Sequence, residues 1–268
     1  MATRVTRRAY HDTVAVMAPL SFVLVNQSTV TDAQYGGALT DALLGQIAEA
    51  VMQQIQTDVS PYWGAAGTTI RVGKPDGSDV LPTEVACFIQ DTLANAPGAA
   101  AYHAVLPNGA PVAYFAREDN DSILSGPQAL SVDVSHELLE TIGDPGANRW
   151  ADYGDLSMSK ALELCDPVQN VCYPVSVAAG TVSVSDFLLP SAFDPGAAGP
   201  WDFKGVAPSQ DDYSNGYMIV RQAMQASDVT GKLGVRVLGT PKRTQKRVHH
   251  SSRFNRRILK AIHASVLR

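Results

Sequence analysis

The sequence predicts an α+β fold, made of one long amphipathic helix near the N-terminus, a group of short strands, and a second helix that carries charged residues on one face. The first helix is expected to start near Leu39, with Asp41 in its first turn and Pro61 beyond its end. Its apolar positions recur at helical spacing and are Leu43, Leu44, Ile47, Val51 and Ile55. This spacing makes it the clearest helix in the chain.

Short apolar or alternating runs predict strands around this helix. The runs in the first half are residues 21–25, 68–72, 85–89, 101–106 and 112–116. The last two are predicted to form a hairpin, because Asn108-Gly109 between them accepts positive φ angles. Later strands are expected within residues 175–193, 218–220 and 235–238, whereas residues 146–154 and 196–212 read as loops.

The second helix is predicted to start at Pro127 and to end at Gly143, and it includes most of the stretch L-S-V-D-V-S-H-E-L-L-E-T-I-G-D-P (130–145). On a helical wheel His136, Glu137 and Glu140 fall within an arc of roughly 100°, opposite the apolar side of the helix. His136 and Glu140 lie one turn apart, near enough to share a cation, and Glu137 flanks the position of a bound water. The pattern indicates a metal-water site, and its alternative is an ordinary solvated helix face.

The H-E-L-L-E sequence resembles the H-E-x-x-H helix of zincin metallopeptidases, with Glu140 in place of the second His. The resemblance extends to E-L-C-D-P-V and V-S-D-F-L-L-P-S-A-F downstream, so that residues 130–220 are similar to an uncharacterised zincin-like family of bacteria and their phages. It implies a zincin-like fold: a mixed sheet, a long N-terminal helix and a motif-bearing active-site helix, followed by a β/loop-rich C-terminal part.

The resemblance also implies roles for residues. Glu137 would be the general base, and His136 and Glu140 would be metal ligands. Glu163 lies twenty-three residues beyond Glu140, comparable to the gap at which zincins supply a third ligand, and is the predicted third ligand.

Two further acids are candidates near this set. Asp166 is expected to orient a ligand, and Asp144 is a rival ligand, although an Asp before Pro is also a common turn residue. Glu163 and Asp166 can equally be read as ordinary loop acids.

Zn²⁺ is the expected cofactor because of the motif, with Ca²⁺ or Mn²⁺ as alternatives because carboxylate ligands favour harder ions, and no metal as a third possibility. The predicted function is a metallopeptidase acting on a peptide or protein, with His103 or Tyr153 able to stabilise an oxyanion. One strand of the 101–116 hairpin is expected to pair with an extended substrate. The alternative is a catalytically inactive structural or binding protein, such as a phage virion component.

Composition limits the remaining classes. The chain has 268 residues, of which 45% are hydrophobic and 18% charged, enough for one full core. No membrane span or secretory signal is recognised, so a cytoplasmic location is expected, or the virion if the chain is phage-encoded. Cys87 is expected to pack as a small hydrophobic residue, while Cys165 and Cys172 could close a small loop.

The charge distribution divides the chain into three parts: an N-terminal arm (1–18), a zincin-like domain (19–240, with its halves meeting near 145) and a basic tail (241–268). The tail contains nine Lys or Arg and no acid, whereas the rest carries twelve basic and twenty-six acidic residues. We expect the tail to bind nucleic acid or an acidic protein partner. The residues predicted to make this contact are Lys242, Arg243, Lys246, Arg247, Arg253, Arg256, Arg257 and Lys260.

Overall fold

The computed structural model describes residues 17–153, 158–222 and 234–238. Nearly all of the predicted arm and the whole basic tail lie outside these residues. Within them the chain is α+β, with a mixed sheet and a long helical segment, as predicted. That segment comprises α1 (Asp41–Gln54), one π-helical turn (Ile55–Val59) and α2 (Ser60–Trp63).

A five-stranded sheet forms the N-terminal half, in the order β2-β1-β3-β5-β4. Its strands are β1 (Ser21–Asn26), β2 (Thr69–Val72), β3 (Val85–Gln90), β4 (Ala101–Val105) and β5 (Pro111–Ala116). All neighbours are parallel except β4 and β5, which form the predicted hairpin with Gly109 at a φ of 85° in its turn. The strand β4 is therefore an edge strand.

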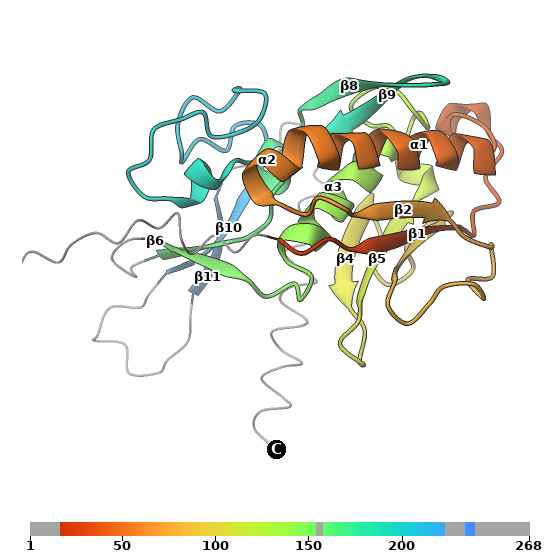
Figure 1. Ribbon diagram of the computed structural model, residues 1–268, viewed down its shortest axis with the longest axis horizontal. Coiled ribbons are helices and arrows are strands. Elements are labelled where there is room, and N and C mark those ends of the chain that lie inside the picture. Colours follow the sequence, from red (N-terminus) through yellow and green to blue (C-terminus); the bar gives the residue numbers. More distant parts are fainter. Residues whose placement is uncertain (1–16, 154–157, 223–233, 239–268) are drawn as a thin grey trace, which may run out of the picture.

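The motif helix α3 (Leu130–Gly143) lies with α1 between this sheet and a two-stranded hairpin, β8 (Cys172–Val177) and β9 (Gly180–Ser185), as Figure 1 shows. Several elements pack on α3: β4 and β5 on one side, β9 on the other, and α1 beside it. As a result every residue of α3 is buried. The face with His136 and Glu140 is not a solvated face.

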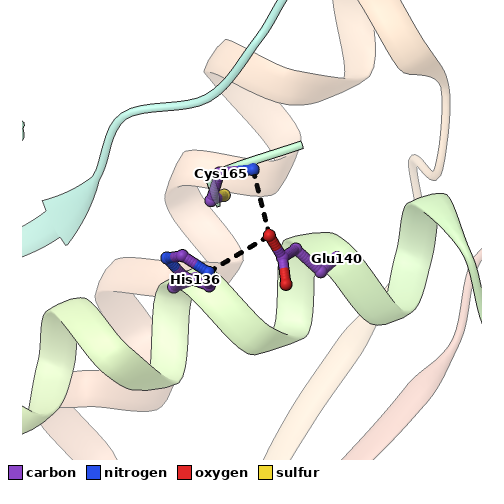
Figure 2. A group of neighbouring side chains, drawn as sticks. All are labelled: His136, Glu140 and Cys165. Atoms are coloured by element: carbon purple, nitrogen blue, oxygen red, sulfur yellow. Dashed lines mark hydrogen bonds and ion pairs between the residues drawn. The ribbon is translucent and has the colours of Figure 1, made fainter. Parts of the chain in front are cut away.

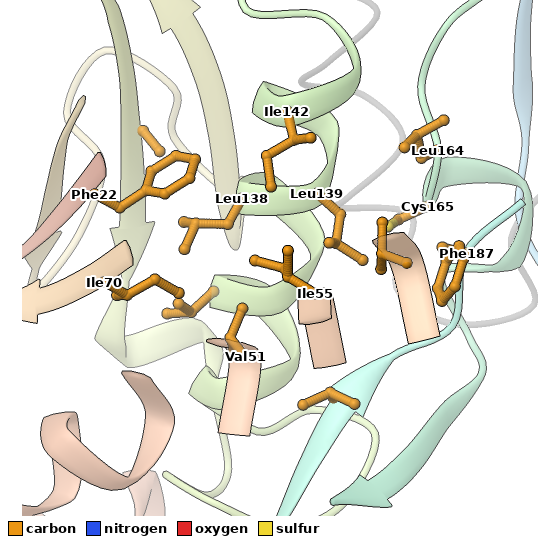
Figure 3. Close-up of a cluster of buried hydrophobic side chains, with 14 of the residues drawn as sticks. Phe22, Val51, Ile55, Ile70, Leu138, Leu139, Ile142, Leu164, Cys165 and Phe187 are labelled. Carbon is orange, nitrogen blue, oxygen red and sulfur yellow. The ribbon is translucent and has the colours of Figure 1, made fainter. Parts of the chain in front are cut away.

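The apolar side of α3 belongs to the main hydrophobic core. Figure 3 shows Leu138, Leu139 and Ile142 in one buried cluster with Phe22 of β1 and Val51 of α1. Each of these side chains is at most 2% exposed. Full burial of such a side chain stabilises the fold by about 1.5–3 kcal/mol, so this contact fixes α3 against the sheet.

A buried polar network sets the rotation of α3. The Ser135 hydroxyl donates to Gln54 Oε1 of α1 at 2.7 Å and accepts the Ser185 backbone N–H of β9 at 3.1 Å. Gln54 Nε2 in turn donates to the Ser185 carbonyl at 2.7 Å. Because these buried groups satisfy one another, a rotated α3 would leave several polar atoms without partners.

A four-stranded sheet, ordered β11-β10-β7-β6, forms part of the C-terminal half. Its strands are β6 (Trp150–Tyr153), β7 (Met158–Ala161), β10 (Met218–Gln222) and β11 (Gly234–Leu238). The runs predicted at 218–220 and 235–238 are confirmed, but the expectation of a loop over 146–154 is wrong for β6. That strand has only four residues, W-A-D-Y, and it is held by pairing with β7, so the run is too short for its pattern to distinguish a strand from a loop.

The sequence led to two expectations about the cysteines, one on burial and one on a disulfide. Cys87 is fully buried, as predicted for a small hydrophobic residue, and burial raises the pKa of its thiol. Cys165 is a free thiol, so no disulfide joins it to Cys172.

In the part of the chain that the structure describes, no helix has the length and apolar character needed to cross a membrane.

Asp186 and Asp202 form a buried acid pair with a testable pH dependence, since both are 0% exposed. Burial, followed by the neighbouring Asp202, raises the pKa of Asp186 to about 8, against about 3.9 in an unfolded chain. The folded chain therefore holds an extra proton, and stability should fall as pH rises between these values.

In Asp186→Asn the group stays neutral at every pH. We expect its melting temperature to decline less than that of the wild type between about pH 5 and pH 8; parallel declines would contradict the assignment.

Candidate metal centre

The centre begins on α3, where His136, Glu137 and Glu140 are 7%, 6% and 3% exposed. Their helical spacing places His136 Nε2 3.1 Å from Glu140 Oε1, one turn further along (Figure 2). Burying an imidazole and two carboxylates is costly unless they are paired or bind an ion. The structure thus brings together the three residues that the helical pattern singled out.

The segment after β7 closes over this face of α3. The backbone N–H groups of Cys165 and Asp166 donate to Glu140 Oε1 at 3.3 and 3.1 Å, and the first of these contacts appears in Figure 2. Asp166 Oδ1 also lies 3.3 Å from His136 Nε2. Asp166 therefore faces both ligands predicted on α3.

A glycine allows this segment to sit where it does. A Cβ on Gly216 would come within 2.0 Å of the Asp166 carbonyl oxygen, so only glycine lets the two backbones approach this closely. The next residue, Tyr217, donates its backbone N–H to that same carbonyl at 3.0 Å. The chain that leads into β10 thereby holds Asp166 beside His136.

The edge strand β4 supplies a further imidazole, His103, which is 9% exposed. Because side chains alternate along a strand, His103 faces α3 while Tyr102 and Ala104 pack in a separate apolar cluster. His103 Nδ1 lies 3.3 Å from Glu137 Oε2 and 3.6 Å from Glu140 Oε2. From the sequence, His103 is proposed as an oxyanion stabiliser. Its place between two apolar residues on a predicted strand is the signal that it lies on the opposite face from them, where it could bind a metal.

The predicted third ligand, Glu163, lies beside His103, where its Oε2 is 3.9 Å from His103 Nε2. Beside His136 the structure has Asp166 instead, so the geometry favours Asp166 as the third ligand of the α3 pair. Asp144, the rival ligand, accepts the backbone N–H of Arg149 at 2.6 Å and so holds the turn after α3. The Tyr153 side chain lies outside the part that the structure describes.

Burial and mutual charge shift the pKa values of these groups strongly. Burial, and next the Glu140 carboxylate, raises the pKa of Glu163 well above its ordinary value and raises that of Asp166 to about 7. Burial also raises the pKa of Glu137. Burial acts against ionisation of Glu140 as well, yet the nearby His136 and His103 lower its pKa.

The pKa values of the His103 and His136 imidazoles depend on burial in the opposite direction from those of the carboxylates. Burial acts to lower their pKa values, but the surrounding carboxylates raise both well above the ordinary value for histidine. Without a cation, the cluster can remain buried only by sharing protons among its members. This charge pattern is the one a divalent cation would relieve.

Several buried atoms of the cluster also lack hydrogen-bond partners within the described residues, namely His103 Nε2, Glu163 Oε2 and Asp166 Oδ2. Two groups have donor atoms that all lie within 4.8 Å of one another: His136 with Glu140 and Cys165, and His103 with Glu137 and Glu140. Imidazole nitrogen, carboxylate oxygen and sulfur donors suit Zn²⁺, whereas oxygen-rich sets suit Mn²⁺ or Ca²⁺. The residues present are therefore compatible with a bound metal ion.

Comparison of the chain with known protein families, with curated proteins and with solved structures found no match.

Proposed function

We propose that the protein is a metal-dependent hydrolase with a zincin-like active site, acting on peptide bonds. The observation that carries this proposal is the convergence of His136, Glu140 and Asp166 from α3 and the segment after β7. The distances from His136 Nε2 are 3.1 Å to Glu140 Oε1 and 3.3 Å to Asp166 Oδ1.

These distances can be compared with a metal site. Ligand bonds of about 2.1 Å in a tetrahedron place neighbouring donor atoms about 3.4 Å apart. Hydrogen bonds between imidazolium and carboxylate are shorter, about 2.7–2.9 Å. The His136–Asp166 separation of 3.3 Å is close to the ligand spacing, whereas the His136–Glu140 separation of 3.1 Å lies between the two values. The donor atoms of His136 and Glu140 also lie within 4.8 Å of Cys165 Sγ. This supports His136 and Glu140, with Asp166 beside His136, as the residues that would hold a cation.

A divalent cation at this position would lower the pKa of a coordinated water towards 7 and polarise a substrate carbonyl. Glu137 is one residue from His136 on the same helix and is the group proposed to accept the proton of the attacking water. Burial raises the pKa of Glu137, which moves this carboxylate towards the range useful for a base at neutral pH. His103, 3.3 Å from Glu137 Oε2, would orient that carboxylate.

A peptide substrate is proposed because the centre lies against the edge of a sheet. In the described residues β4 ends the five-stranded sheet and pairs only with β5. An extended peptide added along β4 would run beside His103 and therefore beside the centre. Backbone pairing would then hold the substrate with little dependence on its sequence.

Glu137→Gln tests this function. The substitution preserves shape but removes the base, so we expect hydrolysis of fluorogenic casein to fall by about 10²–10⁴-fold. Elemental analysis should still find the zinc ion proposed at His136, Glu140 and Asp166, because these three residues are unchanged. Glu118→Gln, at an exposed position in the turn after β5, is the matched control and should leave both quantities unchanged. Unchanged turnover in Glu137→Gln would place the base elsewhere.

The same assay separates the alternative function, an inactive structural or binding protein such as a virion component. That protein would bind zinc in the wild type without hydrolysing casein. Its proposed partner, a nucleic acid or an acidic protein surface, would be contacted by the basic tail, residues 241–268, for which the sequence is the support.

A further inference from the structure

The two carboxylate oxygens of Glu140 face two different imidazoles. Oε1 lies 3.1 Å from His136 Nε2 on the same helix, and Oε2 lies 3.6 Å from His103 Nδ1 on β4. A single cation beside His136 uses the first oxygen and leaves the second directed at His103. Glu140 therefore has the position of a bridging carboxylate.

A second set of donors surrounds the outer oxygen. His103 Nδ1 is 3.3 Å from Glu137 Oε2, and the donor atoms of His103, Glu137 and Glu140 all lie within 4.8 Å of one another. These separations again exceed those of charged hydrogen bonds, about 2.7–2.9 Å, and approach the ligand spacing of about 3.4 Å. His103 on β4 is thus a second imidazole with two carboxylates close to one of its nitrogens.

The charge of the cluster also exceeds what one cation balances. Four buried carboxylates converge here, none more than 6% exposed: Glu137, Glu140, Glu163 and Asp166. Their ion pairs within the described residues are with His103 and His136, which are neutral when they bind a metal. With all four carboxylates ionised, one divalent cation would leave two negative charges buried, whereas two would balance all four.

Glu163 supplies an independent observation. Its Oε2 and His103 Nε2 are both buried, lack hydrogen-bond partners among the described residues and lie 3.9 Å apart. Ligating imidazoles commonly donate their second N–H to a carboxylate, which fixes the ring. A small closure of this gap would give His103 that partner and leave its Nδ1 directed at the cation.

We infer that the centre is binuclear: Glu140 bridges two divalent cations, one held by His136 with Asp166 and the other by His103 with Glu137. The inference rests on the proposed function for its first cation. It adds that Glu163 is a positioning residue for His103 and that Glu137 becomes a ligand when the second cation is bound. Two-metal sites, with ions about 3.5–4 Å apart, are suited to hydrolysis because they stabilise both the attacking and the leaving oxygen.

Zinc titration of the metal-stripped full chain, followed by native mass spectrometry, tests the inference. We expect two zinc ions per wild-type chain and one in His103→Ala. Tyr114→Phe, which alters the other strand of the same hairpin, is the control and should bind two. His103→Asn, a smaller change, replaces His103→Ala if circular dichroism shows that the latter is unfolded.

The outcomes distinguish the two proposals. One zinc in the wild type would overturn the second site and leave the proposed function standing, whereas no zinc would overturn both. Two zinc ions in His103→Ala would overturn the placement on β4. Cobalt substitution locates the pair without any variant: bridged Co²⁺ ions should couple and lose most of their paramagnetic resonance signal, and two full uncoupled signals would contradict a Glu140 bridge.

Discussion

Glu140→Gln is expected to abolish binding of both cations, the largest effect on metal content of any single substitution in the centre. The variant loses the negative charge shared by the two donor sets and turns an amide towards one imidazole. Removal of a group that merely orients a ligand already costs about 10–100-fold in metal affinity, so loss of a bridging ligand should exceed 100-fold. Calorimetric titration of the stripped chain with Zn²⁺ measures this directly.

The fold should survive the substitution. The amide oxygen of glutamine can still accept the backbone N–H groups of Cys165 and Asp166, which donate to Glu140 Oε1. Despite burial, His136 and His103 lower the pKa of Glu140, so its charge contributes to the stability of the metal-free chain, and the metal-free variant should melt below the metal-free wild type while remaining folded. Glu118→Gln, at an exposed position, controls for the loss of a carboxylate. Retention of wild-type zinc affinity by Glu140→Gln would remove Glu140 from the centre.

Local sequence patterns predicted the elements that position the site. The spacing of His136 and Glu140 required only that residues 130–143 be helical, and apolar periodicity was enough for that. The 101–116 hairpin followed from Asn108-Gly109 between two alternating runs. These features depend on near neighbours in the chain, which is why they could be predicted without tertiary structure.

The partners of α3 could not be predicted in the same way. His103 reaches Glu137 across 34 positions of sequence, through the edge position of β4, and nothing local to His103 specifies that position. Similarly, Asp166 rather than Glu163 lies beside His136 because Cys165 and Asp166 bind Glu140 through their backbones and Gly216 packs closely on Asp166. Motif spacing alone does not contain such contacts.

Removal of the cation should destabilise the protein strongly. Glu137, Glu140, Glu163 and Asp166 are buried, and in the absence of a metal they must be neutralised by protons and by His103 and His136. A cation present at about 1,000 times its dissociation constant stabilises the folded state by about 4 kcal/mol. In a domain of this size each kcal/mol shifts the melting temperature by about 2–4 °C, so EDTA should lower it by about 8–16 °C for each cation removed.

Differential scanning calorimetry of the zinc-loaded chain, with and without EDTA, measures this shift, and excess zinc should reverse it. Glu140→Gln is the decisive comparison, because a chain that binds no cation should melt at the same temperature in zinc and in EDTA. A wild-type melting temperature that EDTA leaves unchanged would mean that the buried carboxylates are stabilised by shared protons alone. An equal shift in Glu140→Gln would mean that the stabilising cation binds at another part of the chain.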